Sequence, residues 1–398
     1  MPVLHLSQAL KQYLVITANY WTFTLTDGAL RMLVVLYFHQ LGYSPLSIAM
    51  LFLFYEMFGV VTNLLGGWLG ARLGLNKTMN VGLFLQIGAI AMLAINPQWL
   101  TVAYVMVAQA LSGIAKDLNK MSAKSAIKLL IPKNADSTLY KWVALLTGSK
   151  NALKGVGFFL GAVLLTWLGF SGALWMMAGV LSITWLVSLC LLKQDLGKKQ
   201  NKPKFSEIFS KSRAINLLSA ARLCLFASRD VWFVVALPVY LSSQFGWDHT
   251  WVGGFMATWV ILYGLVQANA PKITGRASSI EQSNRAAVVW ATPLTLVPLL
   301  IASGLVLDVG PLAIVVIGLL VFGALFAINS SLHSYLIVKL ADSDGVSLDV
   351  GFYYMANAMG RLFGTVFSGL IYQSYGLEAC LVVSSLLLAL ALMITRKL

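Results

Sequence analysis

Six basic residues lie in segments that are otherwise apolar enough to cross a lipid bilayer. A charge at that depth costs about 2.5 kcal/mol or more, so such a side chain normally faces a partner, a cavity or a substrate. Acidic residues at comparable depth are fewer, namely Asp27, Glu56 and Asp230. We therefore expect a net positive interior that binds an anion. The candidate substrate-binding residues are Arg31, Lys150, Lys154, Arg222, Arg229 and Arg361.

The spacing of these cations indicates which of them share a helical face. Arg222 precedes Arg229 by seven residues and Lys150 precedes Lys154 by four, and both intervals place side chains on one face. Guanidinium groups bind phosphate-like oxyanions through two parallel hydrogen bonds, whereas lysine supplies a point charge. This combination of groups suits a ligand that carries phosphate-like oxyanions.

A purely structural role stays open for each cation. Asp27 and Arg31 are four residues apart and can form an ion pair within one helix. Arg229 and Asp230 are adjacent and cannot share one helical face, and pairing across helices stays open for either of them. The acids are nevertheless too few to neutralise all six cations. Asp27, Glu56 and Asp230 are expected either to carry protons for coupling or to balance the charge of an empty cavity.

The composition is that of an integral membrane protein. The chain has 398 residues, of which 59% are hydrophobic and 11% charged, and a soluble domain carries roughly 25% charged residues. Alternation typical of membrane β-strands is absent, so we expect an all-α bundle of twelve transmembrane helices. Apolar windows of ~20 residues lie near 14–38, 46–69, 79–96, 99–117, 139–168, 173–192, 214–243, 250–270, 286–306, 311–333, 350–373 and 377–395.

The net charge of +14 is distributed in a way that indicates membrane topology and not nucleic-acid binding. Basic residues occupy alternate connections, which places both termini in the cytoplasm by the positive-inside rule. The N-terminal stretch MPVLHLSQALKQYL lacks a cleavable signal pattern, so the first span is expected to be retained. Lys and Arg are missing from the connections near 39–45, 96–98, 169–172, 244–249, 307–310 and 374–376.

The chain is expected to consist of two six-helix bundles. Residues 193–213 form the longest polar stretch and read as a cytoplasmic linker between bundles 1–192 and 214–398. A weak repeat supports this division, because Asp27 precedes Tyr37 by ten residues and Asp230 precedes Tyr240 by ten. Parallel six-helix repeats with a substrate site between them are the arrangement of major facilitator transporters.

Two short motifs resemble major facilitator patterns. The loop GGWLGARLGLNK, residues 66–77, resembles the family's loop signature, although Ala71 stands where the family has aspartate. This loop is either a gating element or a tight turn with basic anchors. Glycines in the fifth span have the G-x8-G-x3-G spacing of many antiporters and also suit plain helix packing. The loop residues are Gly67, Arg72, Gly74 and Lys77, and the span residues are Gly148, Gly157 and Gly161.

A ladder of lysines with a period of four lies at the end of the fourth span and covers one broad helical face. It is expected either to anchor the protein to anionic head groups or to form a cytoplasmic funnel that concentrates anions. Variants of reversed charge would distinguish the two, since a funnel affects apparent substrate affinity. The ladder consists of Lys116, Lys120, Lys124 and Lys128.

No catalytic or metal-binding arrangement is expected, and no cofactor. The histidines His5, His39, His249 and His333 are isolated and are expected at membrane interfaces. The cysteines Cys190, Cys224 and Cys380 lack pairing or ligand spacing, so they are expected to serve in packing. A membrane-embedded enzyme is the rival class, and turnover of a phosphorylated substrate by the purified protein would favour it.

Several longer strings carry a more specific resemblance. They are similar to the organoarsenical efflux permeases of the major facilitator superfamily, the ArsJ type, from the first span to the last. The strings are ANYWTFTLTDGALRMLVVLYFH (18–39), LSGIAKDLNKMSAKSAIKLLIP (111–132), TGSKNALKGVGFFLGA (147–162), KSRAINLLSAARL (211–223) and ASRDVWFVVALPVY (227–240).

This resemblance implies an exporter in the bacterial inner membrane that confers arsenate resistance, and we expect the protein to be monomeric. It implies a functional pairing with a glyceraldehyde-3-phosphate dehydrogenase, whose product 1-arseno-3-phosphoglycerate the permease removes. An alternative is a transporter for another anionic phosphorylated metabolite, such as a sugar phosphate or phosphonate. A cationic-drug exporter is disfavoured by the positive interior. Proton antiport and potential-driven uniport both stay open.

Overall fold

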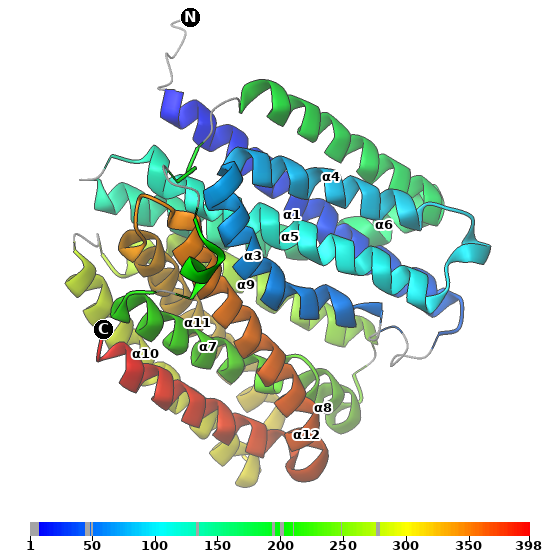
Figure 1. The fold of residues 1–398 in the computed structure, drawn as a ribbon. Helices are drawn as coiled ribbons and strands as arrows, with labels where there is room; N and C mark the ends of the chain where they lie inside the picture. The colour runs from blue at the N-terminus through cyan, green and yellow to red at the C-terminus, as the bar shows by residue number, and fades with distance from the viewer. Residues whose placement is uncertain are drawn as a thin grey trace, which may run out of the picture. The chain divides into compact units, whose positions relative to one another are not determined.

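The protein is built from long α-helices (Figure 1). The computed structural model describes residues 8–43, 48, 51–132, 135–192, 196–199, 203–209, 211–247, 249–275 and 279–398. His5 and parts of the linker 193–213 lie outside these residues, as do the side chains of His39 and His249. The helices of the first half are α1 (Gln8–Gln40), α3 (Leu53–Leu73), α4 (Leu75–Leu93), α5 (Val102–Leu130) and α6 (Asp136–Leu191).

The second half continues in the same way. Short 3₁₀ turns, η1 (Pro97–Trp99) and η2 (Phe205–Ile208), lie in connections of the first half and of the linker. The helices are α7 (Arg213–Phe233), α8 (Ala236–Phe245), α9 (His249–Ile273), α10 (Ile280–Val306), α11 (Pro311–Leu340) and α12 (Val346–Thr395).

Two of the long helices are each interrupted by one glycine. Gly169 in α6 has φ 67° and Gly376 in α12 has φ 79°, a left-handed conformation that costs glycine nothing and other residues much more. Each break falls where the sequence predicts the end of one span and the start of the next. With α7 and α8 counted as one span, the described residues supply twelve helical segments at the predicted positions. The all-helical prediction is therefore confirmed.

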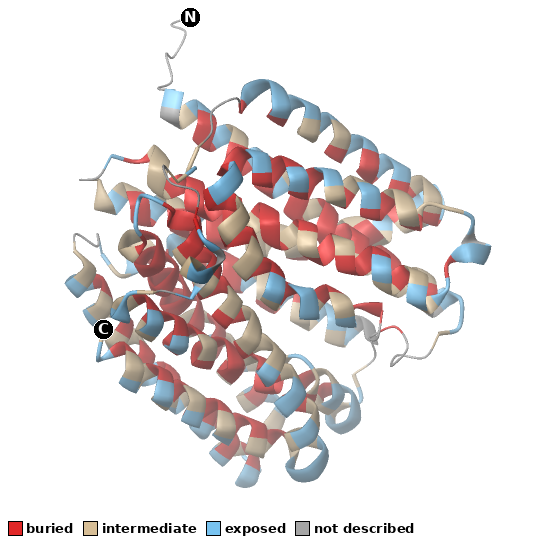
Figure 2. Ribbon diagram, viewed as in Figure 1, coloured by how far each residue is buried: buried red, intermediate tan, exposed pale blue. Residues whose placement is uncertain are grey.

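The outer surface of these helices suits lipid. Among the described residues, six helices are long and apolar enough to cross a membrane by length and composition alone. Large apolar side chains such as Trp167, Ile183, Leu300 and Val306 are more than half exposed. Figure 2 shows exposed residues alternating with buried ones along α6 and α12. That pattern is expected of helices with one face on lipid and one on protein.

The chain forms two compact units, and each contains segments from both halves of the sequence. The first unit comprises Met1–Ala135, Leu153–Ser210 and Ala341–Met355. The second comprises Asp136–Ala152, Lys211–Leu340 and Ala356–Leu398. The start of α6 therefore belongs with later helices, and the start of α12 belongs with earlier ones. The predicted bundle boundaries at 192 and 214 stay a prediction.

Each unit has its own apolar core. In the first unit, Phe23, Phe38 and Phe170 lie among buried leucines and isoleucines of α1, α4, α5 and α6. In the second, the rings of Trp232 and Trp259 pack edge to face, with their centroids 6.1 Å apart, among side chains of α7 to α12. Aromatic pairs of this geometry stabilise a core beyond the area that they bury.

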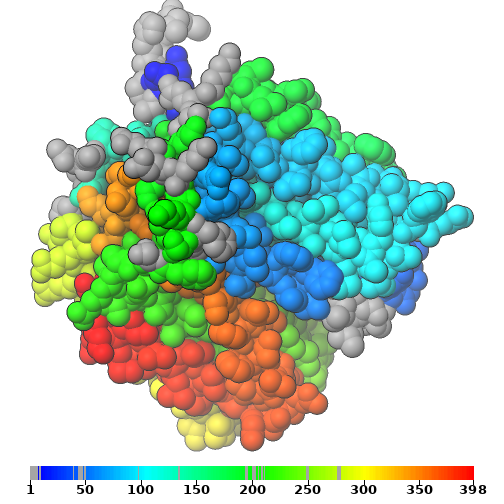
Figure 3. All heavy atoms as spheres, in the orientation of Figure 1, coloured from blue at the N-terminus to red at the C-terminus, as the bar shows by residue number. Residues whose placement is uncertain are grey.

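The described part of the linker packs against the α3–α4 corner of the first unit (Figure 3). The Leu75 amide donates to the Leu196 carbonyl at 2.7 Å, and the Lys199 amide donates to the Ala71 carbonyl at 2.8 Å. The indole of Trp68 donates to the Pro203 carbonyl at 3.1 Å. We call residues 196–199 and 203–208 the linker strap, because hydrogen bonds attach it to this corner at several points.

An ion pair closes the linker strap on itself. Lys199 Nζ lies 2.5 Å from a carboxylate oxygen of Glu207. The hydrogen bond to Glu207 raises the pKa of Lys199, and the same bond lowers the pKa of Glu207. The other Glu207 oxygen accepts from the Lys204 amide at 2.9 Å.

Candidate functional site

The second unit holds a carboxylate between two arginines. Asp230 on α7 has a side chain that is 1% exposed, and Arg229 Nη2 lies 2.5 Å from its Oδ1. Arg361 on α12 approaches from the other side, with Nε 3.3 Å from Oδ2. Asp230 thus pairs across helices with Arg361, as the sequence allows, and also with its neighbour Arg229, although adjacent residues do not share a helical face. The long arginine side chain folds back along the helix surface and reaches its neighbour directly.

Arg222, one of the predicted site residues, is fully buried and held by neutral groups. Its Nε donates to Asn357 Oδ1 at 2.9 Å. Its Nη1 donates to the Ser330 carbonyl at 3.1 Å and to Ser330 Oγ at 3.0 Å. The exposed fraction of Arg222 is 2%. Arg222 therefore adds a buried guanidinium to the helix that also carries Arg229.

The two arginines of α7 both contact the ring of Phe226. Phe226 lies between them in sequence, and its ring centroid is 4.1 Å from Arg222 Cζ and 4.9 Å from Arg229 Cζ. Phe326 on α11 lies 5.5 Å from Arg229 Cζ. The expectation that Arg222 and Arg229 share a helical face is confirmed by this common contact. Cation–π attraction holds the guanidinium groups against the ring without neutralising them.

A polar network extends from Arg222 to α9 and α6. Gln267 on α9 donates to Ser330 Oγ at 3.1 Å, and Asn151 on α6 donates to Gln267 Oε1 at 2.7 Å. His333 is also buried here, on α11, and its Nδ1 accepts or donates no hydrogen bond among the described residues. The expectation of an interfacial His333 is wrong, because α11 continues to Leu340 and carries this residue inside the protein.

The first unit holds Arg31, Asp27 and Glu56 close to Tyr55. Arg31 Nη1 lies 3.4 Å from Glu56 Oε1, and its guanidinium faces the rings of Phe52 and Tyr55. The Tyr55 hydroxyl donates to the Asp27 carboxylate, 2.7 Å from one oxygen and 2.9 Å from the other. Arg31 thus pairs with α3, and Asp27 is satisfied by a tyrosine that the sequence did not single out.

An acid that the sequence analysis missed lies beside this group. Asp117 on α5 is buried, with Lys120 Nζ 2.5 Å from Oδ1 and Lys116 Nζ 4.0 Å from Oδ2. Lys116 also faces the Tyr55 ring at 3.8 Å. The signal in the sequence was an aspartate inside the lysine ladder, three residues before Lys120, which we had treated as part of a helix end.

The rest of the lysine ladder contacts the start of α12. Lys124 is 3% exposed, and its Nζ donates to the Tyr354 hydroxyl at 2.5 Å. Lys128 donates to the Ala341 carbonyl. α5 continues to Leu130, so the lysines extend a buried helix beyond the predicted end of the span. The buried position of Lys124 does not fit a head-group anchor, and the funnel role of the ladder stays a prediction.

Lys150 and Lys154 are half-buried residues of α6. They fall in different units, Lys150 in the second and Lys154 in the first, so their joint contribution to one site stays a prediction. The backbone around Lys154 is close to α1, because a Cβ added at Gly28 would lie 2.8 Å from the Lys154 carbonyl.

The predicted gating loop brings α3 close to the start of α12 within the first unit. A Cβ on Gly67 would lie 2.4 Å from the Ser347 carbonyl, and Ser347 Oγ donates to the Gly67 carbonyl at 2.7 Å. Gly74 has φ 98° and separates α3 from α4. Arg72 and Lys77 are exposed, with Arg72 over the Trp68 ring. These contacts give the loop a packing role, and its gating role stays a prediction.

The glycines of the fifth span also lie at close helix contacts. Gly157 and Gly161 face the backbone of α1 in the first unit, where an added Cβ would lie 2.6 Å from the Leu25 carbonyl and 2.3 Å from that of Ala29. Gly148 faces α9 in the second unit, where an added Cβ would lie 2.5 Å from the Gly264 carbonyl. The packing interpretation therefore accounts for all three.

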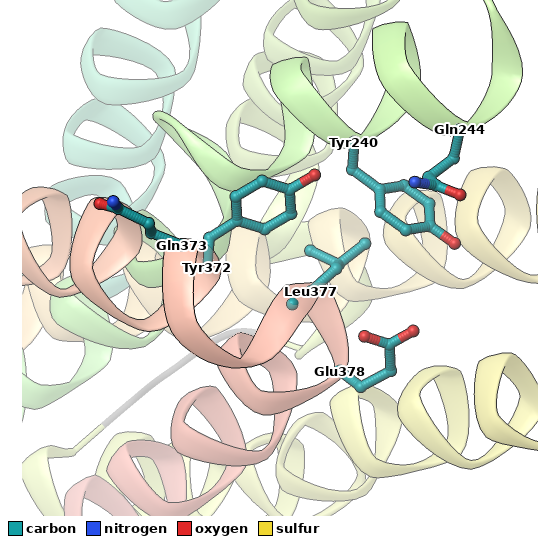
Figure 4. A pocket seen from close by; sticks show the side chains of 7 residues that line it. Tyr240, Gln244, Tyr372, Gln373, Leu377 and Glu378 are labelled. Atoms are coloured by element: carbon teal, nitrogen blue, oxygen red, sulfur yellow. The ribbon is translucent and has the colours of Figure 1, made fainter.

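A small cavity lies elsewhere in the second unit, where α8 ends and α12 is interrupted (Figure 4). Its volume is about 380 Å³, and none of the predicted cations lines it. The Tyr240 hydroxyl and the Glu378 carboxylate point toward each other in this view. An acidic, tyrosine-lined cavity is unsuited to an anion, so we place the candidate site at the buried arginines.

The described residues contain no group of three or more His, Cys, Asp or Glu that could hold a metal ion. Cys224 and Cys380 are free and buried, in agreement with a packing role, whereas Cys190 is exposed.

A helical, multi-pass membrane protein with buried cations and paired carboxylates has the architecture of a secondary transporter. Residues 14–334 match the family model of the Major Facilitator Superfamily, and the chain belongs to this family. It is accordingly a transporter for a small molecule and not an enzyme.

Solved structures agree with this fold over nearly the whole chain. The human organic anion transporter MFSD10 has a TM-score of 0.72 at 16% identity and covers 96% of this chain and 99% of its own. The E. coli fucose:proton symporter FucP has a TM-score of 0.75 at 11% identity, with coverage of 98% and 99%. A bacterial homologue of the iron transporter ferroportin has a TM-score of 0.74 at 13% identity. The match covers 97% of this chain and 98% of that one. A comparison with curated proteins found no match.

Proposed function

We propose that this transporter exports an anionic organoarsenical, 1-arseno-3-phosphoglycerate, from the cytoplasm. The observation that carries the proposal is the arrangement at Asp230. One buried carboxylate faces Arg229 and Arg361, while Arg222, on the same helix, is held by neutral acceptors. Positive charge thus exceeds negative charge in this cluster, and a ligand with several negative charges would balance it.

The first unit contributes basic groups that are balanced by acids. Arg31, Lys116 and Lys120 lie close to three carboxylates, those of Asp27, Glu56 and Asp117. We propose that Arg31, Arg222 and Arg229 bind one oxyanion of the substrate, Lys150 and Lys154 bind the other, and Arg361 lies nearby. The solved structures that share this fold are described as an organic anion transporter, a fucose:proton symporter and a homologue of an iron transporter. The substrate class therefore rests on the charges of this chain.

The choice of an arsenylated substrate rests on the resemblance of the long sequence strings to ArsJ-type permeases. In this proposal the protein lies in a bacterial inner membrane with both termini in the cytoplasm, as a monomer. A glyceraldehyde-3-phosphate dehydrogenase forms the substrate from arsenate, and export followed by hydrolysis outside confers arsenate resistance.

Transport would proceed by alternating access of the site to the two sides of the membrane. An anion that leaves a cell with a negative interior gains about 2.3 kcal/mol per charge for each 100 mV, which makes uniport sufficient for a multivalent anion. Asp27, Glu56 and Asp230 would otherwise carry protons for antiport. Collapse of the membrane potential and of the pH gradient in separate experiments distinguishes the two mechanisms.

Everted membrane vesicles that contain the protein provide the test. They are supplied with glyceraldehyde-3-phosphate, NAD, the dehydrogenase and labelled arsenate. We expect arsenic to accumulate only when every component is present, and not in vesicles with Arg229→Gln or Arg361→Gln. Accumulation with arsenate alone would indicate an oxyanion transporter instead. No accumulation in active vesicles would favour a sugar phosphate or phosphonate, to be tried next.

A further inference from the structure

Two lysines of α5 approach the same carboxylate, one closely and one at a longer distance. Lys120 Nζ lies 2.5 Å from Asp117 Oδ1, while Lys116 Nζ remains 4.0 Å from Oδ2. Oδ2 accepts no hydrogen bond from the described residues, although Asp117 is 2% exposed. Buried carboxylate oxygens are normally hydrogen-bonded, so an unbonded one requires an explanation.

Aromatic rings flank the lysines on two sides. The Tyr55 ring centroid lies 3.8 Å from Lys116 Nζ, and the Tyr354 ring centroid lies 5.0 Å from Lys120 Nζ. Such contacts orient an ammonium group and leave its charge available to an anion. Asp117 is thus one negative charge between two positive ones.

A glycine of α3 packs closely against the unbonded oxygen. A Cβ on Gly59 would lie 3.0 Å from Asp117 Oδ2, so any larger residue would crowd this oxygen. The position of the carboxylate therefore depends on a small residue at Gly59, on the side where the carboxylate is not hydrogen-bonded.

We infer that Lys116 and Lys120 form an oxyanion subsite that Asp117 occupies when no substrate is bound. The ligand class is a dianionic tetrahedral group, such as the phosphate or arsenate end of an organic ester. This inference rests on the proposed function, since it treats the first unit as part of the anion site. Asp117 acts as a built-in competitor, which the incoming dianion displaces from the lysines.

This competition has a use in transport. A site of buried lysines without a counter-charge would hold a dianion tightly and release it slowly. When Asp117 returns to the lysines, it replaces part of the interaction that the departing ligand loses, and release becomes easier. The binding free energy of the anion then depends on the difference between two interactions, that of the lysines with the anion and that of the lysines with Asp117.

The test measures binding of inorganic phosphate and of arsenate to the purified full-length protein by calorimetry. Asp117→Asn removes the competitor and is expected to tighten binding roughly tenfold, the factor expected from 1.4 kcal/mol. Lys120→Gln is expected to weaken it by a similar factor. Lys272→Gln removes an exposed lysine at the end of α9 and serves as a charge-matched control with unchanged binding.

Gly59→Ala keeps every charge and provides the second variant if Asp117→Asn does not fold. It is expected to weaken anion binding, because the added methyl group crowds the position of Oδ2, which the oxyanion takes when it displaces Asp117. Unchanged or weaker binding in a folded Asp117→Asn protein, or unchanged binding in Gly59→Ala, would overturn the inference. If those variants bind anions as the wild type does while Arg229→Gln abolishes export, the subsite is wrong and the proposed function stands.

Discussion

The amide of Asn151 on α6 donates to Oε1 of Gln267 on α9 at 2.7 Å, inside the second unit. Gln267 in turn donates a hydrogen bond to Ser330 Oγ, which also accepts one from Arg222. Asn151→Ala should therefore lower the free energy of unfolding by about 1 kcal/mol, the usual net contribution of a hydrogen bond. Thermal unfolding of the purified protein measures this.

Asn269→Ala is the matched control for that experiment. Asn269 lies on the same helix as Gln267, is exposed, and donates to the carbonyl of Leu265 in its own helix. An equal loss of stability in both variants would show that the network through Gln267 adds nothing.

The contact between α6 and α9 depends on the absence of side chains at two glycines. A Cβ on Gly148 would lie 2.4 Å from the Ala268 amide nitrogen, and a Cβ on Gly264 would lie 2.6 Å from the Gly148 carbonyl. Gly148→Ala should therefore destabilise the protein by about 1–3 kcal/mol, as overpacking does. Gly179→Ala, where nothing lies within 4 Å, should leave the melting temperature unchanged or raise it.

Removal of the charge on Asp230 should leave two arginines without their carboxylate. Breaking a buried ion pair by removal of one partner costs about 3–5 kcal/mol, so Asp230→Asn should unfold at a lower temperature. Arg361→Gln combined with Asp230→Asn should recover part of the loss, because one unpaired cation is removed. A double variant less stable than Asp230→Asn would contradict the pairing of Asp230 with Arg361.

The linker strap should depend on pH through Lys199 and Glu207. The pKa of Glu207 is lowered from 4.5, so its contribution is present above that value and is lost as the pH falls through the lowered pKa. The pKa of Lys199 is raised from 10.5, so its contribution is present below that value and is lost as the pH rises through the raised pKa. The pair is therefore intact in the window between these values.

Hydrogen exchange at the Lys199 and Leu75 amides reports on this pair, because both amides form hydrogen bonds between the linker strap and the α3–α4 corner. At neutral pH, Glu207→Gln should increase their exchange, while Lys204→Gln, which alters an exposed side chain, should not. Identical protection in Glu207→Gln and the wild type would mean that the backbone bonds alone hold the strap.

Much of the fold could be predicted from the sequence because lipid leaves few choices. Hydropathy located the helices, and the breaks at Gly169 and Gly376 lie where the apolar windows separate. The ends were less certain at α5, where Lys120 and Lys124 resemble a helix end exposed to water. Lys120 pairs with Asp117, three residues earlier in the same helix, whereas the burial of Lys124 depends on Tyr354, which is distant in sequence.

The candidate site could be predicted as a list of charges but not as a set of pairs. Helical periodicity correctly grouped Arg222 with Arg229, since a seven-residue interval returns to one face. It failed for Arg229 and Asp230, since periodicity describes where Cα–Cβ bonds point and not how far an arginine reaches. Neutral partners such as Asn357 and Ser330 carry no charge signal at all.

The composition of the two units also has a consequence for biosynthesis. The first unit includes Ala341–Met355, and the second includes Asp136–Ala152, so each needs a segment made far earlier or later than the rest. The ribosome delivers the first six spans long before the start of α12 exists. Gly67 and its neighbours on α3 therefore enter the membrane before their partner Ser347 has been synthesised. Neither unit reaches its full set of contacts until translation is almost complete.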